Sequence, residues 1–99
     1  MRFGIWSPTN PRDGVSHVDL YAQQIEEVRI AEECGFDHIW FYEHHVSPSG
    51  PMPSPNLMIA AAASVTKRIR LGAMVNILPY RNPLIAAEEA AQLDTLTNG

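Results

Sequence analysis

The sequence has little cysteine, little positive charge and no long apolar run. One cysteine in 99 residues, Cys34, excludes an internal disulfide framework and fits a reducing cytoplasm. Seven Lys and Arg against eleven Asp and Glu leave a net charge of −4, so there is no basic surface for nucleic acid or an anionic membrane. The longest apolar run, residues 57–65, is far shorter than the roughly 20 residues of a membrane span. The first six residues contain no signal peptide, so we expect a cytoplasmic protein that binds neither nucleic acid nor membrane.

Three short segments have the composition of buried parallel strands. They are residues 3–6, 38–42 and 69–75, which are rich in β-branched or aromatic residues and lack clean alternation. This pattern is typical of a parallel strand that is covered on both faces.

The first predicted helix covers residues 17–34. Ser16 can cap it, with Asp19 three positions on, and Gly35 can end it in a left-handed conformation. Cys34, at its end, is expected to be a small buried hydrophobe. The helical period places one set of side chains toward the core and another in solvent: Val18, Tyr21, Ala22, Ile25 and Val28 inward, and Gln23, Gln24, Glu26, Glu27 and Arg29 outward.

Two further predicted helices each begin with a cap residue followed by a proline. Residues 55–66 follow the cap Ser54, and residues 83–98 follow the cap Asn82. In both helices a proline fills the first helical position, where its missing N–H costs nothing.

The alternation of strands and helices predicts a parallel α/β fold. The strands begin roughly 31 to 35 residues apart, which fits the roughly 31 residues per unit of an eight-fold barrel. A doubly wound sheet has the same order and remains an alternative. Three units leave two strand edges unpaired. We therefore expect residues 1–99 to be the N-terminal three βα units of a TIM barrel, in one incomplete domain.

Glu43, His44 and His45 directly follow the second predicted strand. The carboxyl ends of barrel strands form active sites, and a histidine there can carry a proton. Neighbouring residues in extended chain point to opposite sides, so only one histidine is expected to face the site. A solvated polar loop is the plain alternative. A metal-dependent hydrolase using both histidines is another, although adjacent histidines rarely converge on one ion, and no metal is predicted.

Gly72 and Asn76 interrupt the apolar third strand. A glycine in a strand admits either a ligand or a neighbouring side chain, and both interpretations stay open. Asn76 could hydrogen-bond the edge of a heterocycle, and Trp6 could line a pocket at the end of the first strand. The chain contains no glycine-rich dinucleotide or phosphate motif, which weakens a nicotinamide-type interpretation.

Residues 31–45, AEECGFDHIWFYEHH, resemble the bacterial luciferase-like flavin monooxygenases. Residues 66–72, TKRIRLG, the Ile77-Leu78-Pro79 segment and the tail from Asn82 to Gly99 continue the resemblance in family order. Together these segments cover nearly the whole chain.

The resemblance implies a TIM-barrel monooxygenase. Reduced FMN, supplied by a separate NAD(P)H-dependent reductase, and O₂ would oxidise a small organic substrate such as an aldehyde. The deazaflavin F420, which some relatives use for hydride transfer, is the alternative cofactor, and the Glu-His-His triplet favours FMN.

The resemblance also assigns roles to residues. His44 would assist catalysis and Glu43 would lie near the flavin. Met74 and Val75, joined by a cis peptide bond, would approach the flavin ring together with Asn76. Trp6 and His45 are the predicted substrate contacts.

The family dimerises through its second and third helices. Both are rich in small residues here, which permit close helix packing, although alanines facing the barrel are an equal alternative; they are Ala60 to Ala63, Ala86, Ala87, Ala90 and Ala91. The phosphate site of a TIM barrel lies near strands seven and eight, which this chain does not contain. We therefore expect little or no activity from the isolated chain, and a non-catalytic flavin-binding or dimerisation module is the alternative function.

Overall fold

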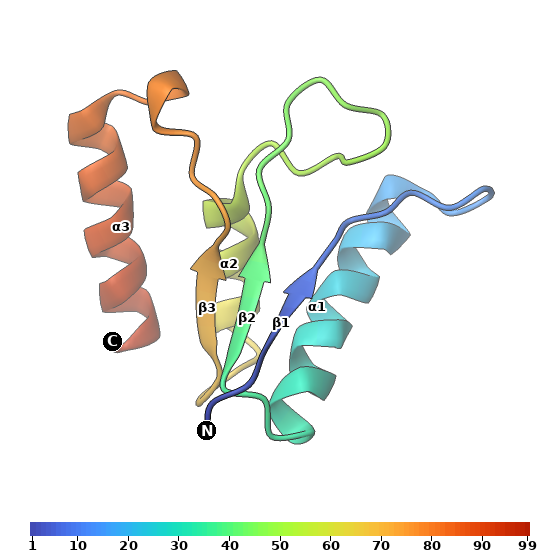
Figure 1. Cartoon of the computed structure of the whole chain (residues 1–99), viewed down its shortest axis with the longest axis horizontal. Coiled ribbons are helices and arrows are strands. Elements are labelled where there is room, and N and C mark those ends of the chain that lie inside the picture. The colour runs from blue at the N-terminus through green and yellow to red at the C-terminus, as the bar shows by residue number, and fades with distance from the viewer.

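The computed structural model describes residues 1–99 and contains one parallel sheet with helices beside it (Figure 1). The strand order is β1-β2-β3, the order of the sequence. The elements are β1 (Gly4–Ser7), α1 (His17–Glu33), β2 (His38–Phe41), α2 (Pro55–Ala63), β3 (Arg70–Ala73), the 3₁₀ turn η1 (Leu78–Tyr80) and α3 (Pro83–Thr97). None of the helices combines the length and apolar content needed to cross a bilayer.

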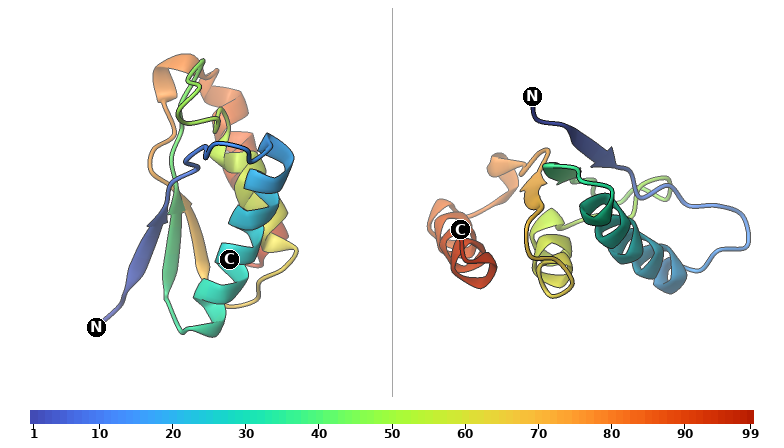
Figure 2. Two further views of the ribbon diagram at one scale, coloured as in Figure 1. Left: turned by 90° about the vertical axis from the view of Figure 1, so that its right-hand side faces the viewer. Right: turned by 90° about the horizontal axis from the view of Figure 1, so that it is seen from below.

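All three helices lie on one face of the sheet (Figure 2). This arrangement follows from crossover connections of one hand between strands that keep their sequence order. The opposite face is open and carries Trp6, 53% exposed, and Trp40, 38% exposed. Within residues 1–99, only the face that receives the helices is covered (Figure 2).

The strands are shorter than predicted at the carboxyl end of β3. The Met74 N–H donates to the Phe41 carbonyl at 2.6 Å, which is the last bond of the ladder. The next backbone donor with a partner is the Ile77 N–H, which turns to the carboxylate of Glu43. Met74 and Val75, which belong to the predicted strand of residues 69–75, therefore lie in the segment that follows β3.

The predicted caps are confirmed in all three helices. Each cap accepts backbone N–H groups from the first turn: Asp19 N–H to Ser16 Oγ at 3.1 Å, Leu57 N–H to Ser54 Oγ at 3.4 Å and Leu84 N–H to Asn82 Oδ1 at 2.9 Å. Gly35 has φ +88°, the left-handed conformation expected after the first helix. Helix α2 ends earlier than predicted, at Ala63, because the Ser64 and Thr66 hydroxyls bond its last carbonyls.

The inward face of α1 differs from the predicted one. Its buried residues are Leu20, Gln24, Val28 and Ala31, whereas Val18 is 78% exposed and Ala22 is exposed. Gln24 is buried because its Nε2 donates to the Ser7 carbonyl at 3.5 Å and to Ser7 Oγ at 3.3 Å. Cys34 is exposed at the C-cap, contrary to the prediction that it is buried.

One core joins the helices to the sheet. It contains ten buried residues from α1, β2, α2 and the adjoining loops: Val28, Ala31, Ile39, Phe41, Tyr42, Met52, Met58, Ile59, Ala62 and Ile69. Ile5 of β1, Leu71 and Ala73 of β3 and Leu93 of α3 pack against it. Every strand and α-helix thus contributes to the same apolar cluster, which fixes the loops at the strand ends.

Gly72 makes room for the ring of Trp40 on the open face of the sheet. The two residues are register partners. A Cβ at Gly72 would lie 2.5 Å from Trp40 Cε3 and Cζ3. Of the two interpretations of this glycine, the structure supports the one in which it accommodates a neighbouring side chain.

Gly72→Ala is expected to destabilise the protein by about 1–3 kcal/mol, because the new methyl group displaces a packed indole. Urea unfolding measures the loss. In a Trp40→Leu background the same substitution should cost much less, since the obstructing ring is gone. An equal cost in both backgrounds would show that the Trp40 contact is not the cause.

Candidate functional site

The candidate site lies at the carboxyl edge of the sheet. Because the strands are parallel, the loop that follows β2 and the segment that follows β3 leave this edge together (Figure 1). The first carries Glu43, His44 and His45, and the second carries Met74, Val75 and Asn76.

Glu43 is the centre of this edge. Its side chain is 1% exposed. Oε1 accepts a hydrogen bond from His45 Nε2 at 2.7 Å, and Oε2 accepts from the Ile77 N–H at 2.9 Å and from Arg81 Nη2 at 3.2 Å. Glu43 therefore joins the loop after β2 to the segment after β3.

The charge of Glu43 is stabilised by these partners. Burial acts to raise the pKa of the Glu43 carboxyl, because an anion is poorly solvated inside the protein. The hydrogen bonds from His45, Ile77 and Arg81, with the positive charge of Arg81, outweigh burial and hold the pKa below its usual value. At neutral pH this side chain is an anion and an acceptor, and it does not act as an acid.

The two histidines of the triplet have different surroundings. His45 bonds Glu43 and meets the ring of Tyr80 edge-on, with ring centroids 5.3 Å apart. His44 instead packs on Tyr42, with ring centroids 4.6 Å apart, and its side chain is exposed. This agrees with the expectation that adjacent residues diverge, and it leaves the His44 imidazole free for chemistry.

Aromatic rings connect β1 to His44. Trp6 lies 6.0 Å from Tyr42 between ring centroids, and the Tyr42 hydroxyl donates to the Thr9 carbonyl at 2.7 Å. A Cβ at Gly50 would lie 2.8 Å from His44 Nδ1, so this glycine lets the imidazole lie against the loop. The structure thus brings Trp6, Tyr42 and His44 into one row of rings.

Residues 74–76 have the features of a platform for a flat ligand. The Met74–Val75 peptide bond is cis, which confirms the expectation from the resemblance. Met74 and Val75 are 48% and 57% exposed, and the buried Asn76 Oδ1 has no hydrogen-bond partner. Exposed apolar side chains suit the face of a heteroaromatic ring. The unpaired Asn76 Oδ1 is an acceptor for an N–H donor.

Arg81 is a site residue that the sequence analysis missed. It follows η1, its side chain is 15% exposed, and it bridges Glu43 and Glu89, the latter at 3.1 Å. The sequence offered one indication of this role: Arg81 is the only charged residue between Arg70 and Glu88. Isolated cations in apolar sequence are candidates for buried ion pairs.

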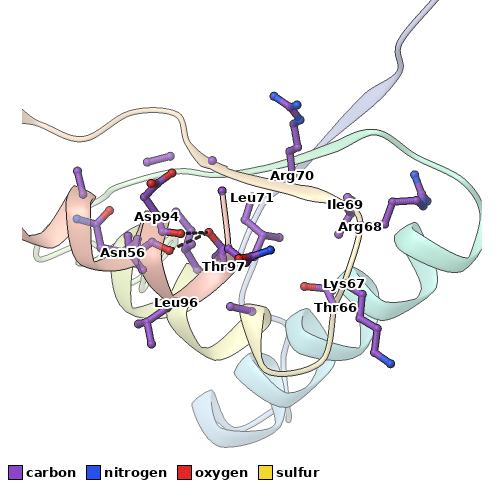
Figure 3. Close-up of a pocket in the computed structure, with 18 of the residues that line it drawn as sticks. Asn56, Thr66, Lys67, Arg68, Ile69, Arg70, Leu71, Asp94, Leu96 and Thr97 are labelled. Carbon is purple, nitrogen blue, oxygen red and sulfur yellow. Dashed lines mark hydrogen bonds between the residues drawn. The ribbon is translucent and has the colours of Figure 1, made fainter.

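A cavity of the structure lies elsewhere. It has a volume of about 730 Å³ and follows the unpaired edge of β3, between α2 and the C-terminal half of α3 (Figure 3). Arg68, Arg70 and Asp94 are among its lining residues, and it reaches the carboxyl edge only at Asn76. None of Glu43, His44 and His45 lines it, so we do not assign it as the catalytic site. No group of three or more His, Cys, Asp or Glu side chains is arranged to hold a metal ion.

Comparison with known proteins decides the family. The sequence pattern of the family described as luciferase-like monooxygenase matches residues 1–99. The chain belongs to this family.

Individual relatives match over most of this chain but over only a small part of their own length. The 4-hydroxyprotoasukamycin monooxygenase of Streptomyces nodosus subsp. asukaensis is 40% identical over 94% of the chain and 25% of its own length. The oxygenase component of flavin-dependent trigonelline monooxygenase from Acinetobacter baylyi is 38% identical over 88% of the chain and 24% of its own length. The chain therefore spans about a quarter of these curated relatives.

A solved luciferase-like structure shows the same arrangement of elements. The oxygenating constituent of 3,6-diketocamphane monooxygenase from Pseudomonas putida, a type II Baeyer-Villiger monooxygenase solved with FMN, superposes with a TM-score of 0.92 at 29% identity. The match covers 100% of this chain and 27% of that protein.

Because Glu43 is stabilised as an anion, we expect the folding stability to fall in acid. Because the folded state lowers the pKa of Glu43, its ionised form adds stability above about pH 4.5, the usual value, and the contribution disappears as the pH falls through the folded-state pKa. Between about pH 6 and about pH 3 the unfolding free energy should therefore fall less in Glu43→Gln than in the native chain.

Urea unfolding at each pH measures this difference. Glu88→Gln, which removes an exposed carboxylate of α3 that makes no hydrogen bond, is the matched control. Equal acid sensitivity in Glu43→Gln and the native chain would contradict the assignment of Glu43 as a stabilised anion.

Proposed function

We propose that residues 1–99 form the first three βα units of a TIM-barrel flavin monooxygenase, within one domain. The observation that carries this proposal is the 2.9 Å hydrogen bond from the Ile77 N–H to Glu43, which holds residues 74–76 beside the Glu-His-His triplet in a luciferase-like chain. The reaction is the oxidation of a small organic substrate, such as an aldehyde, by O₂ and reduced FMN.

Three features of the fold support the barrel. The strand order contains no reversal, and all helices cover one face of the sheet, as in a barrel and unlike a doubly wound sheet. The cavity along the free edge of β3 leaves space for a neighbouring strand. The open face with Trp6 and Trp40 is the side that a barrel encloses.

The residues at the carboxyl edge fit a flavin. Met74 and Val75 offer apolar surface to one face of the ring and exclude water there, and Asn76 Oδ1 accepts a hydrogen bond from its edge. When bound, reduced FMN would supply the electron pair that reduces one oxygen atom of O₂ to water while the other oxygen atom enters the substrate. Glu43 keeps the Met74–Val75 segment in place.

His44 is the proposed acid–base residue. Its imidazole is exposed at the carboxyl edge, its ring is oriented by Tyr42, and it makes no side-chain hydrogen bond that would occupy it. It can hold or deliver a proton at a substrate oxygen. Trp6 and His45, each partly exposed at the same edge, are proposed to contact the substrate.

Two partners and a location complete the proposal. Relatives described as an oxygenase component and an oxygenating constituent support a separate flavin reductase. Exposed small and apolar residues on α2 and α3, including Ala61, Ala87 and Leu57, support an isologous homodimer through these helices. The free and exposed thiol of Cys34 supports a cytoplasmic location.

Asn76→Ala is expected to weaken the binding of reduced FMN by about tenfold, because it removes a buried acceptor of one hydrogen bond. Anaerobic titration of the whole protein measures the dissociation constant, and the mass in solution tests the dimer on the same sample. The control is Asn10→Ala, which alters an exposed amide. Unchanged affinity in Asn76→Ala would exclude Asn76 from the flavin site.

His44→Ala is expected to lower the oxygenation rate of the whole protein by roughly 10²–10⁴-fold, the usual contribution of one acid–base group. The affinity for reduced FMN should stay the same. His17→Ala, an exposed histidine at the start of α1, is the control. An unchanged rate would support the alternative of a non-catalytic flavin-binding module.

A further inference from the structure

A continuous set of polar contacts runs from the carboxyl edge of the sheet to the helices. His45 bonds Glu43, Glu43 bonds Arg81, and Arg81 bonds Glu89. Asn56 Nδ2 then donates to Glu89 Oε2 at 2.8 Å. These contacts join the loop after β2, the segment after η1, helix α3 and the first turn of α2.

We propose that Arg81 is the positioning residue of this site: by bridging Glu43 and Glu89 it holds Glu43 against the Ile77 N–H and so fixes residues 74–76. This inference rests on the proposed function, in which residues 74–76 hold the flavin ring. Arg81 acts through Glu43 and needs no contact with substrate or flavin.

The contacts of Glu43 Oε2 make Arg81 necessary. This one oxygen accepts from both the Ile77 N–H and Arg81 Nη2. The Glu43 side chain is 1% exposed, so water has little access to replace a lost partner. Without Arg81 the buried carboxylate keeps no permanently positive partner, and a buried charge that loses its partner is strongly unfavourable.

Arg81 is itself held from two sides. Its backbone N–H donates to the Leu78 carbonyl at 3.0 Å, which closes η1. Its Nη1 donates to Glu89 Oε2, and Asn56 fixes that oxygen from α2. With donors on two nitrogens, the guanidinium thereby spans both carboxylates.

The test compares Arg81→Gln with the native chain in three measurements on the whole protein. The first is hydrogen exchange at the Ile77 amide, expected to become roughly tenfold faster because its acceptor is no longer held. The second is the carboxyl ¹³C titration of Glu43, whose pKa should rise, because the hydrogen bond and positive charge of Arg81 that hold it down are lost while the burial that raises it remains. The third is the dissociation constant of reduced FMN, expected to rise about tenfold.

Two variants separate positioning from a general loss of structure. Arg29→Gln is the matched control, because Arg29 also joins two carboxylates, Glu26 and Glu33, on the exposed surface of α1. It should leave all three measurements unchanged. Arg81→Lys keeps the positive charge and should restore the Glu43 titration and most of the Ile77 protection. If Arg81→Gln does not fold, the comparison of Arg81→Lys with the native chain decides, and a lysine variant in which Ile77 exchange is unprotected overturns the proposal.

The outcomes distinguish this inference from the proposed function. If Ile77 exchange and the Glu43 titration are unchanged in Arg81→Gln, the positioning role is wrong whatever the flavin result. If the native protein binds no reduced FMN, the proposed function fails, and the two flavin-independent measurements still decide the role of Arg81 in fixing residues 74–76.

Discussion

A carboxylate removed from water controls the carboxyl edge of this sheet. The Glu43 side chain is almost fully buried, and such a group is tolerated only where donors surround it. Its donors come from its own loop and from two places more than thirty residues further along the chain, Ile77 and Arg81. Satisfying one charge therefore requires three segments to occupy one arrangement, and the site geometry follows from that requirement.

The hydrogen bond to Glu43 also gives the two histidines different surroundings. His45 faces Glu43 and Tyr80, so its imidazole is committed to a hydrogen bond and a ring contact. His44 packs on Tyr42 and keeps its imidazole at the surface. Because Glu43 remains ionised at neutral pH, it serves as a hydrogen-bond acceptor, and the exposed imidazole of His44 is the group that we propose to carry a proton at this edge.

Local signals in the sequence predicted the helices well. The caps Ser16, Ser54 and Asn82 act within one turn, so their residue types and spacing are sufficient. The meeting of the segments after β2 and β3 was also predictable, because parallel strands end at one edge. The contacts within the candidate site were not predictable, since the Glu43–Arg81 contact joins residues that no periodic pattern relates. The burial of Gln24 was missed for the same reason, because it depends on Ser7 in another element.

Trp40 has a consequence for strand pairing. Its indole lies across the open face with Gly72 as its register partner, and a Cβ at Gly4 would lie 3.3 Å from its Nε1. A slip of β3 by two residues keeps the same face toward the ring but replaces Gly72 by Arg70 or Met74. Either side chain would occupy the space that the indole fills. The Trp40 ring, packed against Gly72 and Gly4, thus favours the observed register of the strands. This register brings the ends of β2 and β3 level at the candidate site.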